Sequence, residues 1–331
     1  MSFFEELTRD NVFIIAEVGV NHNGDMDLAK KLIAAAKEVG ADAVKFQVFQ
    51  PSKLCSSIHR AEQLGLLEEL MLTNQQLVEL KDFAESLGIV WFATPFDEIS
   101  LEFLVSIDSK LLKVGSGELT HSPLLQKISE SNIPTIISSG GFTLKDISRA
   151  LDDLSSIKTI DVAILHCISQ YPAELKNLNL KAMQSIQKEF PNHIVGFSDH
   201  SKGYIASVLA ASLGARIIEK HITLDNSMPG PDHRASLDVT DFAEFVNMVR
   251  LVDKMLGDGV KKREDGENLT GRSIVASCDI EAGRIITPDM LAFKRPGTHL
   301  PPYRQSEVLD RKANKKILRD DFINLTDLDI L

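Results

Sequence analysis

The sequence predicts an α/β protein, a TIM (β/α)8 barrel followed by a small β-rich domain. Three observations carry this prediction. The 331-residue chain is longer than one typical domain and suits a barrel of about 250 residues plus an appendage. Apolar strand-like runs alternate with amphipathic helical stretches, as in parallel β/α units. The alternation stops near residue 257.

Eight apolar runs have the length and composition of buried parallel strands. They are residues 12–18, 43–48, 89–93, 111–114, 135–138, 162–166, 194–197 and 216–219. Right-handed crossovers between so many parallel strands favour a closed barrel over an open sheet.

Helical periodicity fills the intervals between the strands. Asp25 is a helix cap, and Leu28, Leu32, Ile33 and Ala36 then share one face up to Gly40. Further helices are predicted over 73–87, 98–106, 123–131, 144–154, 180–190, 202–213 and 240–256, with a long insertion at 52–71.

The C-terminal part has a different pattern. We assign residues 1–257 to the barrel, the charged, glycine-punctuated residues 258–271 to a linker, and 272–331 to a second domain. Short strands are expected there over 273–276, 284–286 and 291–294. This domain is too small to hold a large core, so we expect it to dock on another surface.

Composition excludes several classes of protein. The net charge of −11, without basic clusters, argues against nucleic-acid binding. No apolar run reaches the length that spans a bilayer, and the first residues lack signal-peptide features. The three cysteines have no disulfide or zinc-ribbon spacing, so we expect a reducing, cytoplasmic location.

Active sites of such barrels lie at the carboxyl ends of the strands. The polar and aromatic residues predicted there are Glu17, Lys45, Gln47, Thr94, Phe96, Lys113, Ser116, Glu118, Ser138, His166, Ser169, Tyr171, His200, His221 and Asp232. Lysines inside a barrel reach solvent only at its mouth, which favours a functional role for Lys45 and Lys113 over half-exposed strand positions. His166 and Cys167 are expected to be packing residues.

His200 and His221 end neighbouring strands, so their imidazoles should lie side by side. Asp199 and Glu219 precede them within two residues, and acids often support metal-bound imidazoles. Without an evident third imidazole or thiolate, such a site favours Mn²⁺, with Mg²⁺ as the second candidate, over structural zinc. Lysines, hydroxyls and a metal together suit a phosphorylated anion beside an oxygen-rich electrophile; nucleotide-binding motifs are absent.

Several motifs then point to a family. They include Glu17-Val18-Gly19-Val20-Asn21-His22-Asn23-Gly24, Lys113-Val114-Gly115-Ser116-Gly117-Glu118, Ser198-Asp199-His200, Glu219-Lys220-His221 and Pro229-Gly230-Pro231-Asp232-His233. Almost end to end, the chain resembles the sialic acid (nonulosonic acid) synthases, which condense phosphoenolpyruvate with an N-acyl amino sugar. Residues 280–297 resemble the antifreeze-like (SAF, β-clip) domain of these enzymes.

The resemblance implies a role for each residue. His200 and His221 would bind the metal, and Lys45, Lys113, Ser116, Ser138, Thr94 and Ser169 would hold phosphoenolpyruvate. Glu17, Gln47, Tyr171 and Asp232 would contact the sugar. In a domain-swapped homodimer, Arg295 would enter the partner's barrel. Glu17 and Glu118 are our candidates for proton transfer, and Phe96 is assigned to substrate binding.

Alternatives stay open at this stage. A Schiff-base pyruvate aldolase would use Lys45 or Lys113 as the nucleophile. A related synthase would take a plain aldose phosphate, and a non-catalytic sugar-binding protein would retain the fold alone. The sequence leaves the amino sugar undecided between N-acetylmannosamine and a diacetamido-trideoxy hexose, the precursor of legionaminate.

Overall fold

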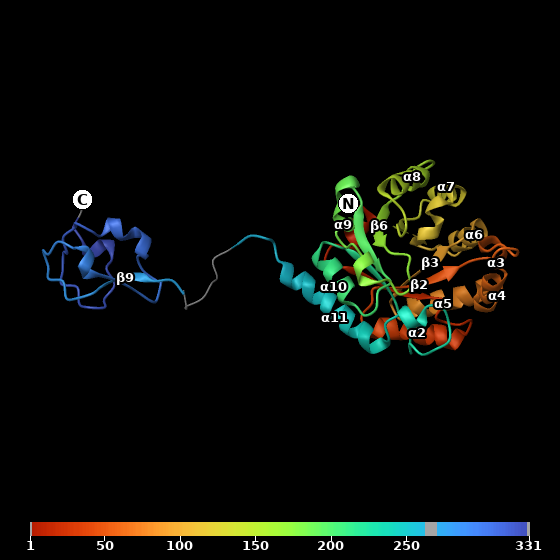
Figure 1. The fold of residues 1–331 in the computed structure, drawn as a ribbon, viewed down its shortest axis with the longest axis horizontal. Coiled ribbons are helices and arrows are strands. Elements are labelled where there is room, and N and C mark those ends of the chain that lie inside the picture. The colour runs from red at the N-terminus through yellow and green to blue at the C-terminus, as the bar shows by residue number, and fades with distance from the viewer. Residues whose placement is uncertain (1, 262–269, 330–331) are drawn as a thin grey trace. The chain divides into compact units, whose positions relative to one another are not determined.

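The computed structural model describes residues 2–261 and 270–329 (Figure 1). The chain divides into two compact units, residues 1–259 and 260–331, and each is described by itself. Residues 262–269 of the predicted linker lie outside the described residues.

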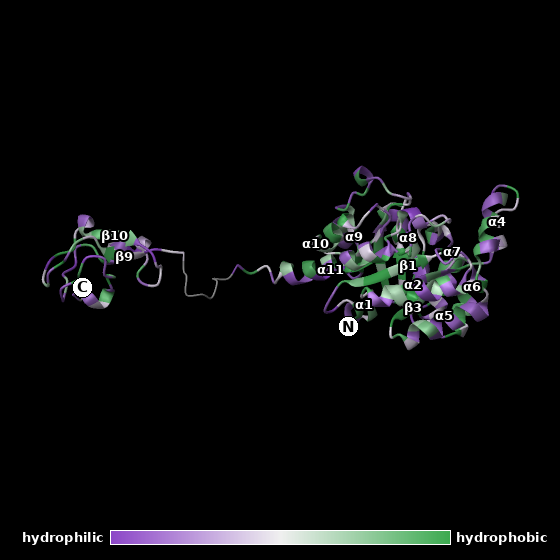
Figure 2. Cartoon of the chain, turned by 90° about the horizontal axis from the view of Figure 1, so that it is seen from below, coloured by the Kyte–Doolittle hydropathy of each residue, from purple (hydrophilic) through white to green (hydrophobic). Residues whose placement is uncertain are grey.

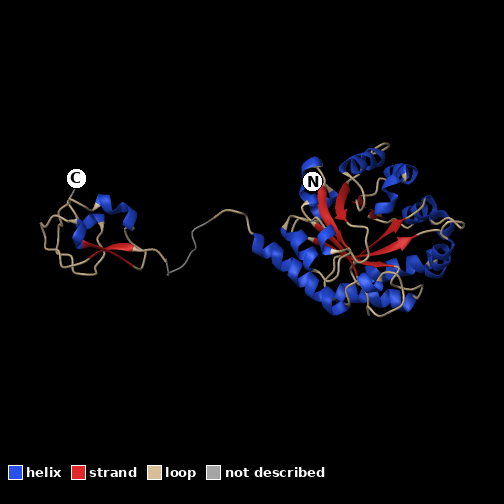
Figure 3. Cartoon of the chain, viewed as in Figure 1, coloured by secondary structure: helices blue, strands red, loops and turns tan. Residues whose placement is uncertain are grey.

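Parallel strands form a closed barrel in the described part of the first unit, which confirms the predicted fold class. Each strand pairs with the next in sequence, and the last pairs with the first. The strands are β1 (Phe13–Gly19), β2 (Ala43–Val48), β3 (Val90–Pro95), β4 (Leu112–Val114), β5 (Thr135–Ser138), β6 (Val162–Cys167), β7 (Ile194–Asp199) and β8 (Ile217–His221). Figure 3 shows them surrounded by helices.

The helices of the first unit lie around the barrel, and most of them cover its outer face. They are α1 (Phe3–Leu7), α2 (Met26–Glu38), α3 (Pro51–Leu54), α4 (Ala61–Leu70), α5 (Asn74–Ser86), α6 (Glu98–Ser106), α7 (Ser122–Ser131), α8 (Leu144–Leu154), α9 (Ala182–Glu189), α10 (Ile205–Ser212) and α11 (Val239–Leu256). Capping fixes several starts: Asp25 caps α2 as predicted, and Thr73 and Thr143 form capping boxes. No helix in the described parts of the chain is long and apolar enough to cross a bilayer.

Some predicted elements differ from the structure. The insertion at 52–71 contains most of α3 and all of α4, and the N-terminal helix α1 was not predicted. The helix predicted over 202–213 begins later, at Ile205, because Gly203 has a left-handed φ of +67°. Figure 2 shows green, apolar strands among helices that carry both polar and apolar residues.

The barrel interior is packed toward the amino ends of the strands. Phe13, Phe92, Leu165 and Ile217 belong to one buried cluster there, and Phe4 of α1 joins it. Apolar side chains therefore fill this end of the barrel. Polar side chains that point inward gather at the opposite, carboxyl end.

Strand register brings the polar residues to one level. Glu17 of β1 is paired with Lys45 of β2 and with His221 of β8. Ser198 of β7 is paired with Glu219 of β8. Because partners in register have neighbouring side chains on the same face, these residues meet inside the barrel mouth.

The second unit contains the antiparallel pair β9 (Ser273–Ala276) and β10 (Leu291–Lys294), as predicted. The predicted strand at 284–286 is wrong: Ile285 forms only an isolated bridge to Lys312. The unit has its own core, to which Ile274, Ile286 and Val308 contribute. It also contains the 3₁₀ helices η4 (Pro288–Met290), η5 (Pro302–Glu307) and η6 (Leu325–Asp327).

Candidate active site

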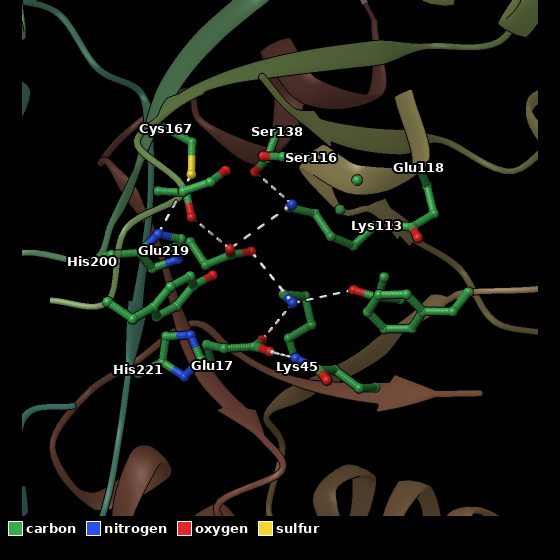
Figure 4. Close-up of a pocket in the computed structure, with 18 residues that line it drawn as sticks. Glu17, Lys45, Lys113, Ser116, Glu118, Ser138, Cys167, His200, Glu219 and His221 are labelled. Atoms are coloured by element: carbon green, nitrogen blue, oxygen red, sulfur yellow. Dashed lines mark hydrogen bonds and ion pairs between the residues drawn. The ribbon is translucent and has the colours of Figure 1, made fainter. Parts of the chain in front are cut away.

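The carboxyl ends of the barrel strands surround a cavity of about 260 Å³ (Figure 4). Nearly all the residues predicted for the site line it. They are Glu17, Lys45, Gln47, Thr94, Phe96, Lys113, Ser116, Glu118, Ser138, Ser169, Tyr171, His200 and His221. The histidine pair and the lysine pair therefore share one opening.

Both lysines are buried and held by neighbouring strands. The ammonium nitrogen of Lys45 lies 2.5 Å from Oε2 of Glu17 and donates a hydrogen bond to the Thr94 hydroxyl, at 3.2 Å. Lys113 donates to the Ser138 hydroxyl, at 2.6 Å. Burial opposes the charge on Lys45, but Glu17 and Glu219 outweigh it and raise its pKa. Burial lowers the pKa of Lys113.

Glu219 lies between the two lysines, and sequence reasoning did not assign it to the site. Its carboxylate oxygens lie 3.7 Å from the ammonium of Lys45 and 3.9 Å from that of Lys113. Ser198, which also lines the cavity, donates a hydrogen bond to Glu219 at 2.9 Å. Burial disfavours the charge of Glu219, but the two lysines outweigh this and lower its pKa to about 2. The alternation along β8, with Glu219 and His221 on one face, could have identified it.

The histidine rings lie side by side, with their centroids 5.7 Å apart. Nδ1 of His200 lies 2.8 Å from the carbonyl oxygen of Ile168. Since a carbonyl only accepts, Nδ1 carries the proton and Nε2 keeps its lone pair. Burial, with a smaller contribution from His221, lowers the pKa of His200 to about 4, so this ring is neutral at pH 7.

The residues present fit a divalent cation. Nδ1 of His221 is buried and has no hydrogen-bond partner among the described residues. A neutral imidazole with a free ring nitrogen is the form that binds metals. Elsewhere in residues 2–261 and 270–329, as here, no group of three or more His, Cys, Asp and Glu side chains is arranged to hold a metal.

Asp199 and Glu219 do not support these imidazoles in the way the sequence predicts. Asp199 forms an ion pair with Lys220, at 3.2 Å, instead of contacting His200. Glu219 faces Ser198 and the lysines. Tyr171 contacts the pair instead, and its ring centroid lies 3.9 Å from that of His200.

Glu118 and Glu17 occupy different surroundings. Glu118 lies in the 3₁₀ helix η1 (Ser116–Thr120), and burial raises its pKa to about 7. Burial also raises the pKa of Glu17, although Lys45 opposes the rise. Gln47 donates a hydrogen bond to Oε1 of Glu17, at 3.4 Å.

The hydroxyls of two cavity-lining serines, Ser116 and Ser169, lie close to Gly140. The amide of Gly140 donates to Oγ of Ser116, at 2.9 Å. A β-carbon at residue 140 would stand 2.4 Å from Oγ of Ser169, so only glycine fits here without displacement. Ser116 and Ser169 therefore reach the cavity because residue 140 has no side chain.

Other predictions had mixed outcomes. His166 is a packing residue as expected, and its Nε2 bonds the Leu178 carbonyl. Cys167 was expected to pack as well, but it lines the cavity. Asp232 lies beside the lining residues, with Oδ2 3.9 Å from Nδ1 of His221. Arg295 follows β10 in the second unit and is exposed; its role stays a prediction.

Comparison with known proteins decides the family. Residues 32–261 match the NeuB family, and residues 271–329 match the SAF domain. This chain belongs to the NeuB family. The predicted resemblance is confirmed, and the protein is an enzyme of this family.

Two relatives can be aligned with nearly the whole chain. An N,N'-diacetyllegionaminic acid synthase from Legionella pneumophila is 40% identical, covering 92% of this chain and 91% of the relative. Human N-acetylneuraminate-9-phosphate synthase is 35% identical, with 94% and 91% coverage. The crystal structure of N-acetylneuraminic acid synthetase from Leptospira borgpetersenii matches with a TM-score of 0.73 and 33% identity, over 77% of this chain and 88% of that one.

Proposed function

We propose that this NeuB-family enzyme condenses phosphoenolpyruvate with the open-chain form of an N-acyl amino sugar. Water is consumed, and a nonulosonic acid and inorganic phosphate are formed. The observation that carries this proposal is the convergence of Lys45, Lys113, His200 and His221 on one cavity (Figure 4). Relatives named as legionaminic, pseudaminic and sialic acid synthases support it.

The lysine side of the cavity suits phosphoenolpyruvate. Its phosphate and carboxylate carry the negative charge that two buried ammonium groups attract in a low-dielectric site. Thr94 and Ser138 already accept hydrogen bonds from these lysines and can turn their hydroxyl protons to substrate oxygens. Ser116 and Ser169 supply further hydroxyls from the same wall.

The histidine side suits a divalent metal, and we propose Mn²⁺ held by Nε2 of His200 and by the ring of His221. When bound, such a cation supplies Lewis-acid polarisation of the sugar aldehyde. Tyr171 lies against His200 and would order the sugar chain beside it. Glu17, Gln47 and Asp232 border the same region and would bind the sugar hydroxyl and amide groups.

The reaction requires proton transfers that the acids of the site can perform. C3 of phosphoenolpyruvate bonds to C1 of the sugar while the aldehyde C=O π bond opens, the aldehyde oxygen takes up a proton, and C2 becomes electron-deficient. Water adds to C2 and loses one proton. The bond between C2 and the phosphate ester oxygen then breaks, phosphate leaves with both bonding electrons, and the C2 hydroxyl loses its proton as the keto group forms. Glu118, whose pKa is raised to about 7 by burial, can take or return this proton at its carboxylate.

We infer that a diacetamido-trideoxy hexose is the first candidate sugar. The two relatives named as N,N'-diacetyllegionaminic acid synthases are 39–40% identical to this chain, against 35% for the human N-acetylneuraminate-9-phosphate synthase. N-acetylmannosamine is the second candidate. The discriminating groups are the few polar side chains at the sugar end of the cavity.

Phosphate release tests the reaction. The purified protein is assayed with phosphoenolpyruvate, Mn²⁺ and either sugar, and the product is identified by mass spectrometry. The proposal expects phosphate only when sugar is present, no turnover in EDTA, and recovery with Mn²⁺. Sugar-independent phosphate release, or full turnover in chelator, contradicts it.

Burial lowers the pKa of Lys113, which is the one observation that favours the aldolase alternative. Treatment with borohydride in the presence of pyruvate distinguishes the two reactions. Irreversible inactivation with a pyruvate adduct on Lys113 supports the aldolase. The proposed synthase forms no covalent adduct and retains its activity.

We also propose a domain-swapped homodimer in which Arg295 reaches the partner's sugar. Mixing Lys113→Met and Arg295→Ala chains under exchange conditions tests this arrangement. Random pairing would restore about a quarter of the wild-type sites, since half of the dimers are mixed and each has one intact site. No recovery in mixed dimers contradicts the swap.

A further inference from the structure

Lys220 is a fully buried lysine of β8, directly before the proposed metal ligand His221. Neither the proposed synthase reaction nor the aldolase alternative gives it a role. Its side chain has 0% exposure. Its neighbours Glu219 and His221 line the cavity. Since side chains alternate along a strand, Lys220 points away from the cavity, toward the helix layer.

Asp199 neutralises Lys220 at the end of the strand ladder. The ammonium of Lys220 lies 3.2 Å from Oδ2 of Asp199 and donates a hydrogen bond to the carbonyl of Ser201. Asp199 and Lys220 are also backbone partners, the last pair of the β7–β8 register. The ion pair therefore joins two strands at the point where each presents a histidine.

Asp199 also fixes the turn that carries His200. Its Oδ1 accepts the amide hydrogen of Ser201, at 2.8 Å, and Oδ2 accepts the hydroxyl of Ser207 in α10, at 2.6 Å. Ser201 bridges to Ala173, whose amide donates to the His200 carbonyl at 2.8 Å. The segment that presents Tyr171 is thus held to the same turn.

A buried ion pair is a poor source of stability. Desolvating two charges costs several kcal/mol, and apolar residues of similar volume often serve stability as well or better. The outward face of a barrel strand is ordinarily apolar. What this pair adds over a hydrophobic contact is direction, because its hydrogen bonds allow few positions of the two strand ends.

We propose that Asp199 and Lys220 form a positioning pair that sets the separation of His200 and His221 for metal binding. His221 needs such support because its Nδ1 has no hydrogen-bond partner among the described residues. Its place depends on the backbone of β8, which the Lys220 side chain ties to Ser201 and Asp199. The inference rests on the proposed metal site.

The test replaces both members of the pair and measures Mn²⁺ affinity without substrates. Asp199→Asn with Lys220→Met removes both charges together and leaves an amide that can still bond Ser201 and Ser207. Free Mn²⁺ is titrated by electron paramagnetic resonance with the full chain. We expect the dissociation constant to rise by about 10- to 100-fold, the range for residues that orient metal ligands. Metal-free binding of phosphoenolpyruvate should not change.

A matched control removes a different ion pair between a helix and the barrel. Arg250 lies 2.7 Å from Asp42, which also accepts the amide of Ile14 near the amino end of β1. Asp42→Asn with Arg250→Met should lower the denaturation midpoint yet leave Mn²⁺ affinity within about twofold of wild type.

A milder variant covers the case in which the double variant does not fold. Ser207→Ala keeps both charges and removes one hydrogen bond to Asp199, so we expect Mn²⁺ affinity to fall by about two- to fivefold. Wild-type Mn²⁺ affinity in the folded variants overturns the positioning role. If the His200→Ala variant binds Mn²⁺ as tightly as the wild type, the proposed metal site is wrong, and this inference fails with it.

Discussion

Gly140→Ala places one methyl group where the structure has no room for it. The added β-carbon would stand 2.4 Å from Oγ of Ser169 and 3.0 Å from Oγ of Ser116. Ordinary contact begins at 3.4 Å, so the Ser169 hydroxyl must move by 3.4 − 2.4 = 1.0 Å. The φ of Gly140 is not in the left-handed region, so the steric effect is isolated from backbone strain.

The displaced hydroxyls belong to the wall that we assign to phosphoenolpyruvate. Overpacking of this size costs about 1–3 kcal/mol in free energy of unfolding. A displacement near 1 Å lowers kcat/KM for phosphoenolpyruvate by up to about 100-fold. Phosphate release at varied phosphoenolpyruvate concentration measures kcat/KM, and urea denaturation measures the free energy of unfolding.

Gly65→Ala is the control, because a β-carbon at this position in α4 meets nothing within 4 Å. It should keep wild-type activity and gain up to about 1 kcal/mol of stability through helix propensity. Adding Ser169→Ala to Gly140→Ala removes the nearest clashing atom and should recover part of the lost stability. A Gly140→Ala enzyme within twofold of wild type in kcat/KM, and equally stable, refutes the reasoning.

Three further predictions address individual side chains. Lys113→Met should lower kcat/KM for phosphoenolpyruvate by about 100-fold or more. The control Lys30→Met removes the ion pair with Glu79 and should leave kcat/KM unchanged. Equal effects of the two variants in steady-state assays would count against an electrostatic role of Lys113. Glu118 binds its proton more tightly in the folded state, so its raised pKa of about 7 reduces stability as pH rises from 4.5 to 7. Glu118→Gln should therefore lose activity, yet above pH 7 its free energy of unfolding, measured by urea denaturation, should exceed that of the wild type by up to about 3 kcal/mol. The difference should close near pH 4.5, and a difference independent of pH contradicts this. Arg295→Ala should raise KM for the sugar and leave KM for phosphoenolpyruvate unchanged, and an unaltered sugar KM in a two-substrate assay would exclude its proposed contact.

Much of the site follows from local sequence because a barrel converts local position into shared geometry. A polar residue near the carboxyl end of an apolar strand reaches the mouth whichever strand carries it. For this reason the sequence predicts Lys45, Lys113 and the histidine pair at the mouth, where they line the cavity. The strands are predictable because parallel barrel strands are covered on both faces and so appear as continuous apolar runs.

The omissions share a different cause. The lysine partners of Glu219 come from β2 and β4, more than one hundred residues away in the sequence. The local pattern shows only that Glu219 lies two residues before His221, and so it predicts support of that imidazole instead. Asp199 was misassigned in the same way, because its partner Lys220 lies on the next strand. Helix α4 has no side-chain cap at Arg60, and its end is held by Leu70 packing against distant apolar residues. Long-range contacts decide such features, and spacing does not report them.

The paramagnetic effect of Mn²⁺ on the ³¹P relaxation of bound phosphoenolpyruvate tests the central claim most directly. If the histidine and lysine pairs serve one cavity, Mn²⁺ should strongly accelerate ³¹P relaxation in the wild-type enzyme. The variant His200→Ala with His221→Ala should still bind phosphoenolpyruvate and show no acceleration. Bound phosphoenolpyruvate whose ³¹P relaxation ignores Mn²⁺ in the wild-type enzyme would contradict the account.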